Sequence, residues 1–237
     1  IMIKACEKAS KVIIRDFGEL ENLQVKKKGP KDFVTKTDKR VEEILIQELT
    51  KSKKNYSFIT EETGIIKNSN KDTFWIIDPI DGTTNFLHGI PHFAISIALK
   101  FNNEIMSGVI FDPIKNEIFY AEKNNGSFFN NQRIRVSKKN DLDECLFSTN
   151  HLGAKYSDLN LRYTGCASLD LAYVGSGRLD GYFHNNINIW DIAAGAIIVE
   201  EAGGKVNDLN NFEINNIDIR AASSNIYSKM LEKLKNF

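Results

Sequence analysis

The sequence predicts an α+β fold made of two fused halves, and three observations support this prediction. Apolar residues recur at helical spacing near the beginning of the chain and again before its end. Strand-like segments joined by short turns occupy about residues 93–129. After Asp141 the pattern changes to short strands that alternate with helices. We therefore expect an N-terminal half over residues 1–142 and a C-terminal half over residues 143–237.

Two helices are expected at the start of the N-terminal half. In the first, apolar residues within 5–17 fall on one face. In the second, apolar residues within 41–49 do the same, and Thr37 or Asp38 is placed to cap its first turn. The charged segment 26–32 between them contains Gly and Pro, so we expect it to be a loop.

A largely antiparallel sheet is expected next. Short apolar runs at residues 58–60 and 74–77 are typical of buried strands. Further strands are expected at 93–101, 104–111, 117–122 and from Phe128 onward. The segments between these strands, at 102–103, 113–116 and 124–127, contain residues that favour hairpin turns.

Three helices are the clearest elements of the C-terminal half. They are expected at residues 168–174, 191–202 and 227–234. The second is followed by Gly203 and Gly204, and glycine is a common stop after the last turn of a helix.

Composition excludes several classes of protein. The 237 residues include 31 Lys and Arg and 31 Asp and Glu, so the net charge is zero and the basic excess typical of nucleic-acid or anionic-membrane binding is absent. The longest apolar stretches, such as 93–99, are far shorter than the roughly 20 residues of a membrane-spanning helix. Three scattered cysteines without CxxC spacing are expected to be free thiols of a reducing compartment. We therefore expect a cytoplasmic protein that binds neither membranes nor nucleic acids directly.

The segment from Trp75 to Phe86 carries the clearest chemical signal. An apolar strand runs directly into Asp78 and Asp81, so the two carboxylates are expected to face one space. Such a pair is neutralised well by a hard divalent cation such as Mg²⁺, which prefers oxygen ligands. The amides of Gly82 and Thr83 follow at once and could bind an anion. A metal beside an anion site is typical of phosphoryl transfer.

Each acidic residue also has a simpler interpretation. An isolated Asp-Pro-x-Asp-Gly sequence is more often a turn than a metal site. Glu61, after the apolar run that ends at Thr60, could be a solvated loop charge. Asp191 and Asp38 could each be a plain helix cap. Taken singly, none of these residues decides between a structural and a catalytic role.

Taken together, these segments resemble the inositol monophosphatase family. Its two signatures match Trp75 to Phe86 and Trp190 to Gly204. Supporting matches occur, in the family's order, at Gly29–Asp38, Ile59–Glu62 and Gly165–Ala172. The matches cover nearly the whole chain and look closest to the bacterial inositol-1-monophosphatase-like branch, which includes the extragenic suppressor proteins.

The resemblance implies a layered αβαβα sandwich and a Mg²⁺-dependent, lithium-sensitive phosphatase with two or three ions at its site. The first ion would be held by Glu61, Asp78 and the Ile80 carbonyl, and the second by Asp78, Asp81 and Asp191. A third, more weakly bound ion would be held mainly by Glu61. The implied catalytic residues are Thr83, Asp38 and Glu61, which would position and deprotonate the attacking water.

The resemblance also implies a set of substrate-binding residues. These are Asp81, Gly82, Thr83, Gly165, Cys166, Ala167, His184 and Asp191. The chain departs from the family pattern at two of them, because His184 stands where inositol-type members usually have Glu and Cys166 where they have Ser or Thr. His184 could still bond a hydroxyl, or be an ordinary loop histidine. Lys27 or Lys28 stands where the family has a loop lysine, although a solvated basic run also explains them.

Three functions stay open on the sequence. The leading prediction is an inositol-phosphate phosphatase that hydrolyses inositol monophosphate or a related small sugar or polyol phosphate. The second is a fructose bisphosphatase or a nucleotide-phosphate phosphatase on the same fold, because fold does not fix substrate. The third is a mainly non-catalytic protein partner of the transcription or RNA-processing machinery. The resemblance further implies a homodimer, although the segment 148–163, which helps to form that interface in relatives, is short here.

Overall fold

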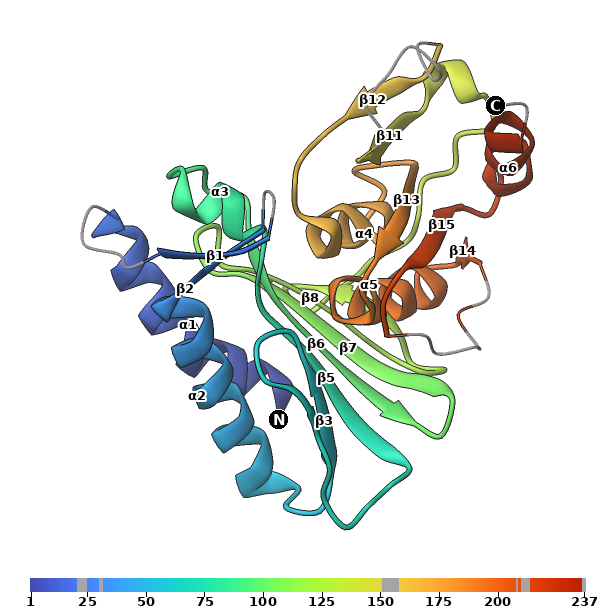
Figure 1. Ribbon diagram of the computed structural model, residues 1–237. Coiled ribbons are helices and arrows are strands. Elements are labelled where there is room, and N and C mark those ends of the chain that lie inside the picture. Colours follow the sequence, from blue (N-terminus) through green and yellow to red (C-terminus); the bar gives the residue numbers. More distant parts are fainter. Residues whose placement is uncertain (21–24, 30–31, 151–157, 208, 210–213, 236–237) are drawn as a thin grey trace.

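The computed structural model describes residues 1–20, 25–29, 32–150, 158–207, 209 and 214–235. Its helices and sheets form five layers (Figure 1). Helices α1 (Met2–Phe17) and α2 (Lys36–Ser52) cover one face of a large sheet, and α4 (Ala167–Gly175) and α5 (Ile189–Glu201) cover its other face. A smaller sheet packs on α4 and α5, and α6 (Tyr227–Lys235) covers its outer side. This is the αβαβα sandwich expected from the sequence.

Within the described residues the large sheet has eight strands. Their spatial order is β10 (Gln132–Arg133), β9 (Gly126–Phe129), β8 (Glu117–Glu122), β7 (Glu104–Asp112), β6 (Ala94–Phe101), β5 (Thr73–Asp81), β3 (Ser57–Thr60) and β4 (Gly64–Ile66). All neighbouring pairs are antiparallel except β3 and β5, which run parallel. A short helix, α3 (Thr83–Leu87), follows β5.

The smaller sheet has five strands within the described residues. Their order is β12 (Asn160–Arg162), β11 (Leu146–Thr149), β13 (Gly181–Ile187), β15 (Ile217–Ser223) and β14 (Gly204–Val206). A separate antiparallel pair, β1 (Val25–Gly29) and β2 (Asp32–Thr35), precedes α2, and a 3-10 turn, η2 (Leu142–Glu144), precedes β11.

Side-chain alternation in the large sheet separates two hydrophobic cores. Successive residues of a strand point to opposite faces. Trp75 and Ile77 of β5 therefore pack with the α1–α2 layer, whereas Ile76 packs with the α4–α5 layer. The α4–α5 layer is tight at Gly195, where an added Cβ would lie 2.4 Å from the Cβ of Leu171. Close packing on both faces makes the sheet a rigid support for groups at its edge.

Most predicted elements are confirmed, and three details are wrong. The hairpin turns after β6, β7 and β8 place Asn102, Asn116 and Asn124 at positive φ, a conformation that Asn tolerates. Residues 26–29, expected in a loop, belong to strand β1 because they pair with β2. Helix α2 begins at Lys36, so neither Thr37 nor Asp38 caps it from outside.

The third wrong detail concerns α5, which begins at Ile189 instead of Asp191. Asn188 is its cap, and Asp191 occupies the third helical position, where its side chain completes a capping box. The expected free thiols are confirmed, because Cys6, Cys145 and Cys166 are all free and buried. Among the described residues, no helix has both the length and the apolar character to cross a membrane.

Candidate active site

Two buried aspartates lie at the end of β5 and face the same layer. Residues three apart on a regular strand would point to opposite faces. Here Asp78 pairs with Ser96 and Asp81 with Ala94, so β5 has one extra residue and a bulge between the two aspartates. The bulge turns both carboxylates toward the α4–α5 layer, and their exposed fractions are only 1% and 7%.

The third carboxylate of the cluster comes from the first turn of α5. Asp191 Oδ2 accepts a hydrogen bond of 3.0 Å from the Asn188 amide, which fixes the side chain at the start of the helix. Ser96 Oγ on β6 donates to the Trp190 carbonyl at 3.1 Å and so ties this turn to the sheet. Carboxylate oxygens of Asp78, Asp81 and Asp191 then lie within 4.8 Å of one another.

The electrostatics of this cluster favour a bound cation. Burial raises the pKa of Asp78 well above its usual range, and repulsion from Glu61, Asp81 and Asp191 raises it further. Burial and then repulsion from Asp81 and Glu61 likewise raise the pKa of Asp191. Burial also raises the pKa of Asp81, against hydrogen bonds from Ser168 and Cys166 that lower it. An all-oxygen donor set under such repulsion fits a hard divalent cation such as Mg²⁺.

The parallel pairing of β3 with β5 places Glu61 near the cluster, although Glu61 is not one of the three residues whose carboxylate oxygens lie within 4.8 Å of one another. Carboxyl ends of parallel neighbours meet at the same edge of a sheet, so the residue after Thr60 lies beside the end of β5. The Glu61 amide donates to the Ile77 carbonyl at 3.2 Å, which places this turn against the strand that carries Asp78. Its charge acts on both Asp78 and Asp191.

Thr83 connects the aspartate turn, which comprises residues 78–83 at the end of β5, with α2. Its Oγ lies 3.0 Å from the Ile80 carbonyl oxygen and 3.3 Å from Asp38 Oδ1, so one hydroxyl proton serves two acceptors. Asp38 is completely buried in the first turn of α2. Gly82, at φ +92°, makes the turn possible, because a Cβ there would lie 3.1 Å from the His92 carbonyl oxygen.

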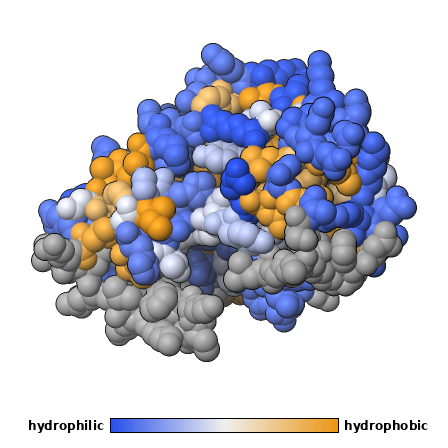
Figure 2. Space-filling model, turned by 90° about the horizontal axis from the view of Figure 1, so that it is seen from above, coloured by the Kyte–Doolittle hydropathy of each residue, from blue (hydrophilic) through white to orange (hydrophobic). Residues whose placement is uncertain are grey.

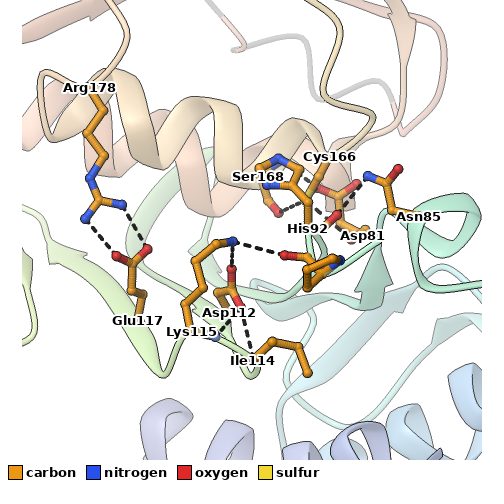
Figure 3. A network of polar contacts seen from close by, with 11 residues as sticks. Asp81, Asn85, His92, Asp112, Ile114, Lys115, Glu117, Cys166, Ser168 and Arg178 are labelled. Atoms are coloured by element: carbon orange, nitrogen blue, oxygen red, sulfur yellow. Dashed lines mark hydrogen bonds and ion pairs between the residues drawn. The ribbon is translucent and has the colours of Figure 1, made fainter. Parts of the chain in front are cut away.

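Residues at the beginning of α4 make hydrogen bonds to the Asp81 carboxylate (Figure 3). The Ser168 amide donates to Asp81 Oδ2 at 2.6 Å, and the Cys166 thiol lies 3.2 Å from the same oxygen. Burial, followed by the charge of Asp81, raises the pKa of the Cys166 thiol well above its usual range. The thiol therefore keeps its proton and acts as a hydrogen-bond donor instead of a nucleophile.

A pocket of about 450 Å³ opens beside the cluster. It is lined by Asp81, Thr149, Asn150, Tyr163, Gly165, Cys166, Ala167, Asp170, Tyr182, His184, Asn186, Ile187, Asn188 and Asp191. Seen from above, the molecule is hollowed between its two sides, and residues of intermediate to hydrophilic character lie beside the hollow (Figure 2). Within the pocket wall, the Tyr182 hydroxyl and His184 Nδ1 are 2.6 Å apart.

The residues expected from the sequence lie in two places in the structure, the pocket and the end of β5. Six of them line the pocket: Asp81, Gly165, Cys166, Ala167, His184 and Asp191. Asp38, Glu61, Asp78, Ile80, Gly82 and Thr83 lie at or beside the turn after β5. The side chains of Lys27 and Lys28, and residues 151–157 of segment 148–163, lie outside the described residues.

Sequence reasoning missed three buried polar residues near the pocket: Asn85, Asp170 and Tyr182. Asn85 stands in the first signature and Asp170 in a supporting match, so their position in a motif was the available signal. No periodicity or spacing indicated which distant residues they contact.

Comparisons with known proteins agree over the full length of the chain. The model of the inositol monophosphatase family matches residues 1–236. An inositol-1-monophosphatase from Caulobacter vibrioides is 40% identical, with 99% of each chain covered. A Nus factor SuhB from Haemophilus influenzae is 39% identical over 99% of this chain and 94% of its own.

Solved structures give the same result. A crystal structure of the extragenic suppressor protein suhB from Bartonella henselae superposes with a TM-score of 0.92 at 42% identity, over 99% of this chain and 96% of that one. The chain belongs to the inositol monophosphatase family.

Proposed function

We propose that this protein is a metal-dependent phosphatase that hydrolyses inositol monophosphate or a related small sugar or polyol monophosphate. The observation that carries the proposal is the cluster of Asp78, Asp81 and Asp191 at one end of a polar pocket of about 450 Å³. A pocket of this size accommodates a sugar-sized ring, and the cluster would hold cations against its phosphate.

Two or three Mg²⁺ ions are the proposed cofactor. Glu61, Asp78 and the Ile80 carbonyl would hold one ion, and Asp78, Asp81 and Asp191 a second. When bound, the ions would supply Lewis acidity toward the attacking water, the phosphate and the leaving oxygen. The raised pKa values of Asp78 and Asp191 support this assignment, because cations relieve the repulsion that raises them.

The protein's own groups would orient the water and the ester. Thr83, whose hydroxyl lies between Ile80 and the buried Asp38, is the proposed positioning group for the attacking water, and Glu61 is proposed to assist it. The amides of Gly82 and Thr83 would contact phosphate oxygens. On the opposite wall, the segment Gly165–Ala167 and His184 would contact the hydroxyls of the alcohol.

Release of inorganic phosphate from a panel of sugar, polyol and nucleotide monophosphates tests this proposal. We expect Mg²⁺-dependent release that Li⁺ inhibits, with small polyol esters preferred. A folded protein that releases no phosphate from any ester in the presence of Mg²⁺ would contradict it. We also propose a cytoplasmic homodimer, which sedimentation of the purified protein and localisation of a tagged copy would test.

A second candidate function rests on the names of relatives. A protein called Nus factor SuhB aligns with 99% of this chain at 39% identity. A role as a protein partner of the transcription machinery is therefore a separate proposal. Asp78→Asn separates the two, because an enzyme needs that carboxylate and a scaffold does not.

A further inference from the structure

Asn85 joins two segments that are remote in sequence. It lies in α3, two residues after Thr83, and its side chain is 9% exposed. Its Nδ2 donates to the His92 carbonyl at 2.8 Å and to the Thr164 carbonyl at 2.8 Å (the first of these bonds appears in Figure 3). Both amide protons are thus donated. The bond to Thr164 joins residues 79 positions apart in sequence and reaches the segment before α4.

The same residue, Thr164, is held on its other side by Asp170. Asp170 Oδ2 accepts hydrogen bonds from Thr164 Oγ at 2.7 Å and from Ser148 Oγ on β11 at 2.6 Å. Asp170 is buried in the first turn of α4. Thr164 is therefore fixed through its carbonyl by Asn85 of α3 and through its hydroxyl by Asp170 of α4.

The segment around Gly82 and Asn85 packs closely against Gly165. A Cβ at Gly165 would lie 3.2 Å from Asn85 Nδ2, and a Cβ at Gly82 would lie 3.3 Å from the Gly165 carbonyl oxygen. Directly after this contact, Ser168 donates its amide to Asp81 at 2.6 Å. A displacement of Thr164 would therefore move the Gly165–Ala167 wall and loosen the bond that holds Asp81.

We propose that Asn85 is a positioning residue that sets the distance between the aspartate turn and the Gly165–Ala167 wall of the pocket. This inference rests on the proposed function, because it assumes that substrate lies between these two segments. Asn85 touches neither the reacting phosphate nor the carboxylate cluster in this account. It acts by holding Thr164.

Asn85→Asp is the sharpest perturbation. It keeps the size of the side chain but replaces the double donor Nδ2 by an oxygen, which then faces two carbonyl oxygens. Two hydrogen bonds are lost, and a carboxylate oxygen faces the negative ends of two carbonyl dipoles. Asn85→Ala removes the same bonds without adding repulsion, so it serves if the aspartate variant does not fold.

Ser57→Ala is the matched control. Ser57 is also buried, and its Oγ takes part in two hydrogen bonds, to the Asn70 carbonyl at 2.9 Å and from the Asn68 amide at 3.0 Å. It lies on β3 and is not among the residues that line the pocket. Its loss costs stability without moving the pocket wall.

Two readouts test the inference. Steady-state kinetics on one polyol phosphate should show KM raised about tenfold in Asn85→Asp with a smaller change in kcat, because the wall is misplaced. Hydrogen–deuterium exchange of the peptide covering 164–170 should be about tenfold faster in that variant, without substrate or metal. In Ser57→Ala both quantities should stay within about twofold of the unchanged protein.

Values of KM and exchange within twofold of the unchanged protein in Asn85→Asp, or in Asn85→Ala, would overturn the inference. An equal rise of KM in Ser57→Ala would also overturn it, because the effect would then follow from lost stability alone. If the unchanged protein hydrolyses no ester, the proposed function fails by itself. The exchange experiment still decides whether Asn85 holds the segment.

Discussion

Asp78→Asn should stabilise the metal-free protein although it removes activity. In the metal-free cluster, Asp78 faces the carboxylates of Asp81 and Asp191 at separations within 4.8 Å. At that distance and an effective dielectric constant near 20, two unit charges repel by about 3 kcal/mol, and this is an upper limit because the raised pKa of Asp78 relieves part of the repulsion by protonation. An asparagine keeps the shape and can still accept the Ile80 amide, which now donates to Asp78 Oδ1 at 2.9 Å.

The upper limit of about 3 kcal/mol corresponds to a rise in Tm of at most roughly 6–12 °C for a chain of this size. The assay is thermal unfolding of chelator-treated protein at neutral pH, followed by titration with Mg²⁺. The unchanged protein should gain about 2.7 kcal/mol when Mg²⁺ reaches one hundred times its Kd. The variant should gain little, and its kcat should fall by orders of magnitude.

Asp112→Asn is the contrasting control. Asp112 is completely buried too, but its carboxylate is paired with Lys115 at 2.5 Å and accepts the Ile114 and Lys115 amides (Figure 3). Loss of that paired charge should lower Tm. A metal-free Asp78→Asn protein that melts below the unchanged protein, or that Mg²⁺ stabilises equally, would refute the reasoning about the cluster.

Three further predictions concern the pocket and the packing behind it. His184→Glu should improve the kcat/KM for inositol phosphate relative to simpler polyol phosphates, and an unchanged ratio would remove His184 from the substrate contacts. Burial raises the pKa of Asp170 from 3.8 to about 7, so the folded state keeps a proton that the unfolded state releases between about pH 4 and 7. Stability should therefore fall as pH rises through this window, by about 4 kcal/mol at most, and Asp170→Asn should flatten the curve of Tm against pH in metal-free protein. Gly195→Ala should cost about 1–3 kcal/mol in urea unfolding, because its Cβ would clash with Leu171, and an unchanged midpoint would show that α4 and α5 can separate freely.

Patterns of apolar residues predicted most of the fold. The helical spacing within 5–17 and 41–49 corresponds to α1 and α2, and the hairpin strands were located to within a residue or two. Strand β1 was missed because its sequence, Val25 to Gly29, contains three lysines and no alternation. Its pairing with β2 depends on a partner strand that local propensity does not encode.

The start of α5 shows that the two roles weighed for Asp191 from the sequence are compatible. Asp191 was considered as a helix cap or as a metal ligand. In the structure Asp191 Oδ2 accepts the Asn188 amide in a capping box, and a carboxylate oxygen also lies within the cluster with Asp78 and Asp81. The capping role therefore does not exclude the proposed role of Asp191 as a metal ligand.

Contacts between distant segments account for what sequence reasoning could not predict about the site. The bulge that turns Asp78 and Asp81 to one side is visible only in the pairing of β5 with β6. The bond from Asn85 to Thr164 joins positions 79 residues apart. Such contacts depend on how the layers pack, so a single sequence without an alignment carries no signal for them.

The most direct test of the central claim is release of inorganic phosphate from inositol monophosphate by the purified protein, with Mg²⁺ and with a chelator. We predict turnover that requires Mg²⁺, is inhibited by Li⁺, and is abolished by Asp78→Asn. Turnover that persists in the chelator, or in the Asp78→Asn protein, would contradict a reaction that depends on this cluster. Absence of turnover from folded protein with Mg²⁺, on this ester and on other polyol phosphates, would favour the role as a protein partner.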